Sequence, residues 1–421
     1  MKNDLLSYSN LGKRLEEPVI VGMMKKALEN PGLVSLAAGF TDTSKLPMDL
    51  VQKAVQELCS RRDSLEYLQY GTNQGRPKLR EETAKFLLSF YSKENATHIK
   101  PANFMISNGS QQSLYLAMQV LCNEGDIILV EGPSYFVLLE LLRGMNVQAL
   151  SIPMLENGDI DIQALDHMLA KMEKEKSLER IKGIYIISYF ANPSSHSLSE
   201  STKVSLGNLI RKWSLNCALI EDAAYRELYF DAPHPSPSIL SIQELDGIPR
   251  LYLGTYTKPF VSGFKIGYSC STDATLLNKM LCVKGHQDFG SANFSQALLE
   301  IILQKNWYTG WLNELHPHYK EKVECFKAIA QEEKLADLGW RWTCPKGGLM
   351  LWLKGPAGFD SSIDSPFYKA CLENGVFYVP GDLCFAERNT KNCIRLSLGS
   401  LPIESLKKGL KRLISTLQQV S

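Results

Sequence analysis

Short apolar runs alternate with stretches of helical spacing through the middle of the chain. Five runs are rich in β-branched and aromatic residues and predict strands, over residues 103–107, 126–130, 182–188, 217–220 and 250–254. Helical stretches such as residues 111–121 lie between several of them. Because strands that alternate with helices form parallel sheets with helices on both faces, this region predicts an α/β domain.

The pattern changes in the last third of the chain. Apolar residues at helical spacing predict three helices, over residues 294–303, 317–333 and 402–418. Apolar runs predict three strands, over residues 348–353, 375–379 and 393–397. This texture is typical of a smaller α+β domain. Near the beginning of the chain, residues 16–29 have helical spacing that ends at Pro31.

Composition and charge narrow the classes of function. A chain of 421 residues is too long for one ordinary core and predicts two domains. Lys plus Arg number 46 and Asp plus Glu 45, so the net charge of +1 does not favour nucleic-acid binding. The 10 cysteines form no CxxC pair, as is typical of free thiols in a reducing compartment. The N-terminus is polar and no apolar run reaches about 18 residues, so we expect a cytoplasmic protein without a membrane span.

Glycine and polar residues follow the first predicted strand. The segment Asn108-Gly109-Ser110-Gln111 can aim backbone amides at an anion, because glycine permits a tight turn and helix N-termini attract phosphate. An ordinary helix cap, with Ser110 accepting a hydrogen bond from its own backbone, would have the same sequence. The segment is a candidate phosphate site that needs support from other residues.

Two later strands are followed by candidate polar groups. Asp222 comes just after residues 217–220, where a buried carboxylate needs a cationic partner such as a protonated pyridine nitrogen. Asn192-Pro193 comes after residues 182–188. Taken alone, the first could be a turn carboxylate and the second a simple Asn-Pro turn. Ligands of open α/β sheets bind beyond the carboxyl ends of the strands, so the two positions together favour a site.

A lysine follows the fifth predicted strand. Lys258 stands beside the hydroxyl-bearing Thr255 and Thr257, as a nucleophile with phosphate ligands next to it would. A random lysine is far more often a surface charge. Its position after a strand, in order with Asn192 and Asp222, makes it a candidate for chemistry.

These segments, taken in order, resemble the class I and II aminotransferases, enzymes of fold type I that depend on pyridoxal 5′-phosphate (PLP). The resemblance is strongest to the 2-aminoadipate and kynurenine aminotransferase subgroup and covers about residues 33–417. The matching motifs are SLAAG at 35–39, LQYG at 68–71, EGPSY at 131–135, PKGG at 345–348 and NCIRLS at 392–397. The resemblance implies a large domain over residues 49–300 with a mostly parallel seven-stranded sheet. It also implies a small α+β domain over residues 301–421, which the N-terminal segment 1–48 joins.

The resemblance assigns chemical roles around the PLP ring. Lys258 would form the internal aldimine and then move the α-proton of the substrate. Asp222 would keep the ring nitrogen protonated, so that the ring accepts electrons. Tyr225 and Asn192 would hydrogen-bond the 3′ oxygen, and Tyr135 would stack on the ring.

Other matched positions would bind the substrate. Arg395 would fork onto the substrate α-carboxylate, with Gly39 and Asn192 beside it. Without the surrounding motif, Arg395 would be read as a surface charge on a strand.

Further positions would bind the cofactor phosphate, namely Ser110, Gln111, Thr255, Thr257 and Lys265. Tyr70 would reach the phosphate in a neighbouring subunit, which implies a homodimer. Lys265 stands where the family usually has arginine, so it would neutralise the phosphate as a point charge.

Two residues beside these motifs depart from the family pattern. Pro259 directly follows the predicted Schiff-base lysine and restricts it to extended backbone. His196 follows the Asn192-Pro193 turn, and we expect an exposed turn histidine, with substrate contact as the alternative.

The predicted function is transfer of an amino group from an L-amino acid to a 2-oxo acid, with 2-oxoglutarate as the expected acceptor. β-Elimination by a carbon–sulfur lyase would use the same residues, so the motifs leave it open. A non-catalytic PLP-sensing module ranks lower, because Lys258 is present.

Overall fold

The computed structural model describes residues 6–30, 32–61, 65–91 and 96–420. Residues 1–5 of the predicted N-terminal segment and Pro31 at its helix end lie outside the described residues. So do residues 62–64 and 92–95 of the predicted large domain and residue 421.

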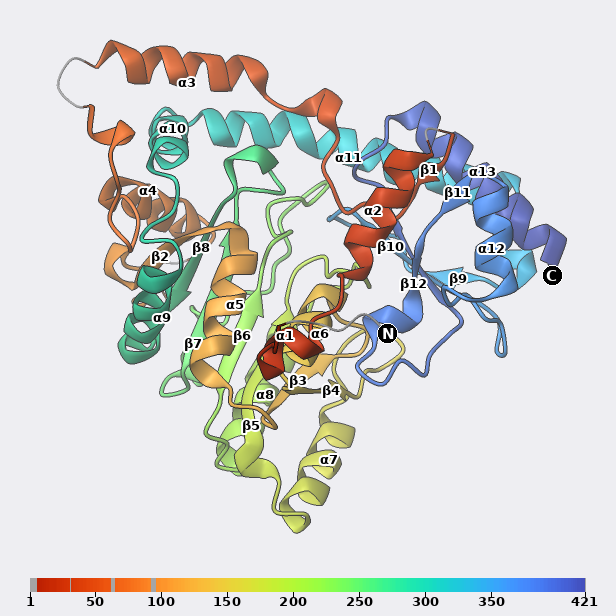
Figure 1. Cartoon of the computed structure of the whole chain (residues 1–421), viewed down its shortest axis with the longest axis horizontal. Coiled ribbons are helices and arrows are strands. Elements are labelled where there is room, and N and C mark those ends of the chain that lie inside the picture. Colours follow the sequence, from red (N-terminus) through yellow and green to blue (C-terminus); the bar gives the residue numbers. More distant parts are fainter. Residues whose placement is uncertain (1–5, 31, 62–64, 92–95, 421) are drawn as a thin grey trace.

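A seven-stranded sheet forms the centre of the molecule, in the order β2-β8-β7-β6-β5-β3-β4 (Figure 1). Its strands are β2 (Phe104–Asn108), β3 (Ile127–Glu131), β4 (Gln148–Ile152), β5 (Ile181–Ile187), β6 (Ala218–Asp222), β7 (Arg250–Thr255) and β8 (Ile266–Ser271). Only β8 runs against its neighbours β2 and β7; the other adjacent pairs are parallel. The predicted α/β fold with a mostly parallel sheet is therefore confirmed.

Helices cover both faces of this sheet because its strands are apolar on both faces. On β3, Val130 faces a core shared with α5 (Gly109–Leu121), α6 (Phe136–Gly144) and α9 (Ala274–Gln287). The preceding Leu129 faces the opposite core, shared with α7 (Ile162–Lys174) and α8 (Glu200–Lys212). Successive residues point to opposite faces, as strand geometry requires.

Two smaller sheets lie beside the large one, at the right of Figure 1. One has the order β12-β13-β10-β9, with β9 (Arg341–Trp342), β10 (Met350–Lys354), β12 (Val379–Pro380) and β13 (Cys393–Ser397). The other pairs β1 (Val34–Ser35) with β11 (Val376–Phe377) in parallel, so an N-terminal strand joins the C-terminal part of the chain. Helices α12 (Pro366–Glu373) and α13 (Ile403–Val420) pack together here. The domain boundaries at residues 48 and 300 stay predictions.

The remaining helices are α1 (Asn10–Arg14), α2 (Val19–Glu29), α3 (Met48–Ser60), α4 (Pro77–Leu88), α10 (Asn293–Gln304) and α11 (Trp307–Glu332). Helix α3 packs against α10, which lies just below it at the upper left of Figure 1. None of the helices within the described ranges is long and apolar enough to cross a membrane.

The predicted start of one helix, at Pro317, is wrong. Pro317 was expected near the start of a helix, where its missing N–H costs nothing, but it lies inside the 26-residue helix α11. The buried residues Leu312, Leu315 and Tyr319 pack on both sides of it. Tertiary packing therefore outweighs the local cost of an interior proline.

Candidate active site

The predicted chemical groups meet at the carboxyl edge of the large sheet. Strands β5, β6 and β7 are neighbours and parallel, so the loops that follow them start at one edge. Asn192 lies in the loop after β5, Asp222 ends β6 and Lys258 lies in the turn after β7. Their order along the chain thus becomes proximity in space.

Lys258 is held by the N-terminal segment. Its Nζ donates a hydrogen bond to the Gly39 carbonyl oxygen at 2.5 Å, across 219 positions of sequence. Burial lowers the pKa of the Lys258 amine, the charges of Arg395 and Lys265 lower it further, and the value falls to about 8. The uncharged fraction of this lysine at neutral pH is therefore larger than that of an ordinary lysine, and the uncharged amine is the nucleophilic form.

Asp222 is a buried carboxylate within electrostatic reach of Lys258, whose pKa its negative charge raises. The Tyr185 hydroxyl donates to Asp222 Oδ2 at 2.7 Å, and the Ala224 N–H donates to Oδ1 at 3.1 Å. Burial raises the pKa of Asp222, and these two donors oppose that shift. The site therefore contains a buried carboxyl group that two hydrogen bonds hold in place.

Arg395 is buried at 2% exposure, yet it has no ion pair among the described residues. One amino group donates to Asn192 Oδ1 at 3.4 Å and the other to the Ala37 carbonyl oxygen. Its Nε has no hydrogen-bond partner within the described ranges, and the guanidinium lies 5.3 Å from the Phe136 ring centroid. A buried guanidinium without an anionic partner can receive a carboxylate from outside.

Two aromatic side chains belong to the same cluster. The Tyr225 phenol bonds with the Asn192 side chain, while burial raises its pKa to about 12. Burial also raises the pKa of Tyr135, and the nearby Tyr225 and the charge of Asp222 add to this effect. The five predicted residues Lys258, Asp222, Tyr225, Asn192 and Tyr135 thus lie around one centre.

The start of α5 lies against strands β7 and β8. A Cβ atom on Gly267 would come 2.4 Å from the Ser110 nitrogen, so only glycine fits beneath this turn. The Cβ position of Gly109, at φ +72°, is 3.6 Å from Thr257 Oγ1. The Thr255 and Thr257 hydroxyls are 2.9 Å apart. Backbone amides and two hydroxyls therefore converge as a phosphate site requires.

The N-cap of helix α5 is Asn108, whose side chain makes no capping hydrogen bond, so Ser110 lies in the first turn and is not the cap residue. Gln111 and Lys265 are both exposed beside this turn. Lys265 is near enough for its charge to lower the pKa of Lys258.

The arrangement fits PLP by the chemistry of its groups. A nucleophilic lysine, a buried aspartate and a cradle closed by Gly267 match the three polar ends of that molecule: the aldehyde, the ring nitrogen and the phosphate. The unpaired Arg395 leaves a separate place for a substrate carboxylate.

Two predicted residues lie away from this centre. Tyr70 is 85% exposed and contacts Phe289 edge to face, with 6.0 Å between ring centroids. His196, expected to be exposed, is half-buried with its ring against Gly158, and burial lowers its pKa. Its neutral ring fills space next to Gly158, which the local sequence could not indicate.

Three contributors were missed by sequence reasoning. Tyr185 binds Asp222, Gly267 underlies the phosphate turn, and the Trp311 indole donates to the Pro259 carbonyl oxygen at 3.0 Å. The first two lie within strands, where a tyrosine reads as core and a glycine as a weak strand former. The hydrogen bond from Trp311 connects the turn after Lys258 to α11.

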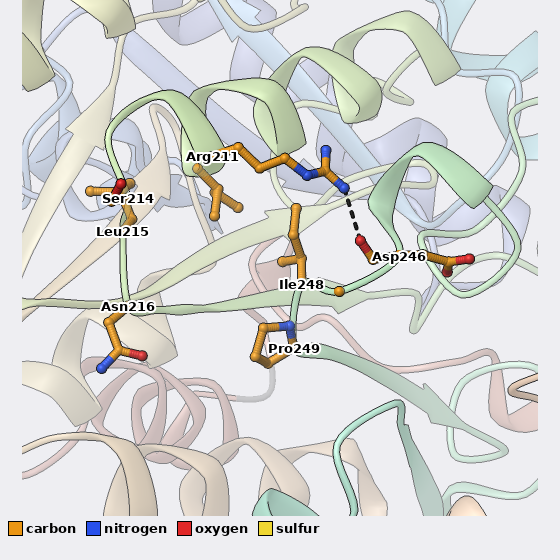
Figure 2. Close-up of a pocket in the computed structure, with 9 residues that line it drawn as sticks. Arg211, Ser214, Leu215, Asn216, Asp246, Ile248 and Pro249 are labelled. Carbon is orange, nitrogen blue, oxygen red and sulfur yellow. Dashed lines mark hydrogen bonds between the residues drawn. The ribbon is translucent and has the colours of Figure 1, made fainter.

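A surface hollow near the start of β6 and β7 is separate from this site (Figure 2). Leu215 and Asn216 precede β6, and Ile248 and Pro249 precede β7, so the hollow lies at the amino edge of the sheet. Its Arg211 already donates to the Asp246 carbonyl oxygen at 2.9 Å. This hollow therefore has no part in the chemistry at Lys258.

Comparison with known proteins agrees with the site. The family described as aminotransferase class I and II matches residues 31–413. Aromatic-amino-acid aminotransferase 1 of Thermococcus litoralis is 29% identical over 98% of this chain and 94% of that protein. The 2-aminoadipate transaminase of Thermus thermophilus is 27% identical over 92% of this chain and 91% of that protein.

Among solved structures, the kynurenine aminotransferase of Pyrococcus horikoshii, in complex with PMP, superposes with a TM-score of 0.86. It is 26% identical and covers 98% of this chain and 97% of its own. These relatives favour transamination over elimination. The chain therefore belongs to the class I and II aminotransferase family and is a PLP-dependent transaminase.

Proposed function

We propose that Lys258 is the residue that holds PLP in this transaminase and that moves the substrate α-proton. The observation that carries the proposal is the meeting of Lys258, Asp222 and the unpaired Arg395 at one sheet edge. When bound, PLP withdraws electrons from the amino acid so that its α-hydrogen becomes acidic. Lys258, with a pKa lowered to about 8, is suited to accept and return that proton.

Residues around Lys258 would orient the cofactor ring. Asp222 offers a negative charge to the ring nitrogen, and Tyr225 with Asn192 offers polar atoms to the 3′ oxygen. Tyr135, at the start of α6, supplies a flat aromatic face.

The phosphate would lie at the start of α5. Ser110 and Gln111 contribute first-turn amides, and Thr255 and Thr257 contribute hydroxyls. The exposed Lys265 would balance the charge from the solvent side.

We assign the substrate α-carboxylate to Arg395, with Gly39 and Asn192 beside it. The guanidinium presents a planar fork that the protein leaves without a carboxylate. A donor L-amino acid and an acceptor 2-oxo acid both carry this carboxylate, so one arginine serves both halves of the reaction. We expect 2-oxoglutarate to be the acceptor.

A homodimer is part of the proposal. Leu65, Leu68, Tyr70 and Phe289 are 73%, 65%, 85% and 69% exposed. They lie together, because Tyr70 contacts Phe289 and the neighbouring Asn293 side chain donates to the Gln69 carbonyl oxygen. An apolar patch of this kind fits a second copy of the chain, whose site Tyr70 would reach.

The test is a half-reaction with single amino acids. Purified PLP-loaded protein is mixed with each donor in turn, and the visible absorbance of the lysine-bound cofactor is followed. We expect the band to disappear with a productive donor, one 2-oxo acid to form per site, and 2-oxoglutarate to restore the band. Release of pyruvate and ammonia from a donor without any acceptor would instead show elimination. Lys258→Ala should abolish both changes.

A further inference from the structure

Tyr185 is a buried tyrosine whose hydroxyl touches the proposed cofactor-binding carboxylate. Tyr185 is 0% exposed and Asp222 7% exposed. The phenolic oxygen lies 2.7 Å from Asp222 Oδ2, a short distance for a hydrogen bond to a carboxylate. None of the sequence motifs includes Tyr185.

Sheet geometry explains how this contact arises. Tyr185 on β5 is paired with Ile220 on β6, and Ile187 is paired with Asp222. Residues two apart on a strand share a face and are separated by roughly 6.6 Å. The long Tyr185 side chain spans that distance, and its hydroxyl reaches Asp222. Phenylalanine would fill the same space and lack only the final oxygen atom.

The Tyr185 hydroxyl affects the protonation equilibrium of Asp222. Burial favours the protonated acid and raises the pKa of Asp222, whereas donation from Tyr185 and from the Ala224 N–H favours the carboxylate. Tyr185 is the only side chain among the described residues shown donating to this carboxylate. It therefore opposes the effect of burial on Asp222.

A second buried acid shows what happens without such a donor. Among the described residues, the donor shown for Glu131 on β3 is the Ile187 N–H, at 3.1 Å. Burial raises its pKa to about 8, and the charge of Asp222 adds to that shift. Burial without a side-chain donor thus favours the protonated form of Glu131.

We propose that Tyr185 is a positioning residue that keeps Asp222 ionised and aimed at the cofactor ring nitrogen. The inference rests on the proposed function, because it needs PLP at Lys258. Without the hydroxyl, the proton shared by Asp222 and the ring nitrogen moves toward the carboxylate. The ring nitrogen then loses positive charge, and the cofactor loses an ionic contact.

The test compares PLP with an analogue in which the ring nitrogen is replaced by carbon. Dissociation constants of both from the cofactor-free full chain are measured for wild type and Tyr185→Phe. A hydrogen bond to a buried charged group predicts a loss of roughly tenfold to a hundredfold in PLP affinity. The affinity for the analogue should not change, because it has no nitrogen for Asp222 to meet.

Tyr368→Phe is the matched control. The Tyr368 hydroxyl is buried and has no hydrogen-bond partner among the described residues, and it lies on α12, away from Lys258. Its removal should leave both dissociation constants at the wild-type values. Melting temperatures of the three cofactor-free proteins show whether a variant is folded.

The outcomes distinguish a positioning role of Tyr185 from a purely structural role. Equal weakening of PLP and the analogue would mean that Tyr185 only supports the fold, and unchanged PLP affinity would remove any role for its hydroxyl. If Tyr185→Phe does not fold, 3-fluorotyrosine at this position keeps the ring and alters the hydroxyl. An unchanged ratio of PLP to analogue affinity would then contradict the proposal. Failure of wild type to bind PLP through Lys258 would overturn the proposed function instead.

Discussion

Cations shielded from solvent include two contrasting kinds in this molecule. Lys203 and Lys322 are 0% exposed, and each has a carboxylate partner inside the chain. Lys203 Nζ is 3.1 Å from Glu221 Oε1, and Lys322 Nζ is 2.7 Å from Asp42 Oδ2. Such pairs compensate for much of the cost of removing the charges from water.

The cations at the carboxyl edge of the large sheet are different. Lys258 and Arg395 donate to carbonyl and amide oxygens, and neither has a carboxylate ion pair among the described residues. Lys258 is half-buried and Arg395 is buried, and a lowered pKa or an external anion would give each of them a use. For these four residues, pairing inside the chain thus separates the structural cations from those of the active site. Arg226 is a third case, a buried arginine that lies over three aromatic rings and has no carboxylate ion pair among the described residues.

The largest effects are expected for two lysines, and they concern different properties. Replacing Lys258 should reduce activity, whereas replacing Lys203 should reduce stability. Lys258→Met should lower kcat/KM by roughly a hundredfold to ten-thousandfold, because a proton-transfer group is lost. Lys203→Met should instead lower the free energy of unfolding by about 3–5 kcal/mol, because Glu221 is left buried without its cation. Steady-state kinetics and urea unfolding of both cofactor-free and loaded proteins measure the two effects. A stable, inactive Lys203→Met protein would break the distinction.

A pair of arginines tests the same distinction between structural and active-site cations. Arg250 is as buried as Arg395, but its guanidinium bonds Asp246 Oδ1 at 2.7 Å and two backbone carbonyl oxygens. Arg250→Leu should cost about 2–3 kcal/mol of stability, because the two carbonyl oxygens become unsatisfied. Arg395→Leu should destabilise the cofactor-free protein less, because loss of the hydrogen bonds to Asn192 and Ala37 is offset by removal of a buried charge that has no carboxylate partner among the described residues.

The kinetic effects of the two arginine variants should be reversed. Arg395→Leu should raise KM for every amino acid and lower kcat/KM by roughly a hundredfold, because the carboxylate fork is gone. The folded fraction of Arg250→Leu should keep the wild-type KM. Equal KM values for wild type and Arg395→Leu would remove Arg395 from the substrate site.

Lys258 also predicts a pH effect on stability. Its pKa is about 8 in the folded chain and 10.5 in the unfolded reference, so between these values the unfolded chain binds the extra proton. The free energy of unfolding of the cofactor-free protein should therefore rise with pH in this window, by up to about 3 kcal/mol. Lys258→Met should lack this rise when unfolding is measured at pH 8 and above. Parallel curves for the two proteins would mean that Lys258 has an ordinary pKa.

The Asp42–Lys322 pair should show the smallest effect, at the acidic end. Burial raises the pKa of Asp42, but bonding to Lys322 and Ser44 outweighs it and the value falls to about 2. The stability that this pair contributes is present above pH 3.8 and is lost as the pH falls toward 2. Lys322→Met should be less stable at neutral pH and less sensitive to this acidification. Identical acid sensitivity in wild type and Lys322→Met would contradict the pairing.

The sequence predicted the positions that strand order controls. Asn192, Asp222 and Lys258 follow neighbouring parallel strands, so their convergence needs only the sheet order. Tyr185 could not be found in this way, because a tyrosine inside an apolar run is ordinarily a core residue. Its role depends on which residue of β6 it faces, and register is a tertiary property.

The two smaller sheets show the same limit of prediction from sequence. Residues 375–379 were predicted as one strand, yet Val376–Phe377 pairs with β1 and Val379–Pro380 pairs with β13. The intervening Tyr378 is 0% exposed and donates to the Ser361 carbonyl oxygen at 2.9 Å. A run of five apolar residues carries no sign that the chain changes sheets at its centre.

The most direct test is to trap PLP on the protein by borohydride reduction and to locate it by peptide mass spectrometry. We predict one modified residue per chain, Lys258, and no modification of Lys265, which lies seven positions further on. The label should disappear in Lys258→Met and persist in Lys203→Met. A label on any other lysine in the wild-type protein, or none at all, would contradict the placement of the active site at Lys258.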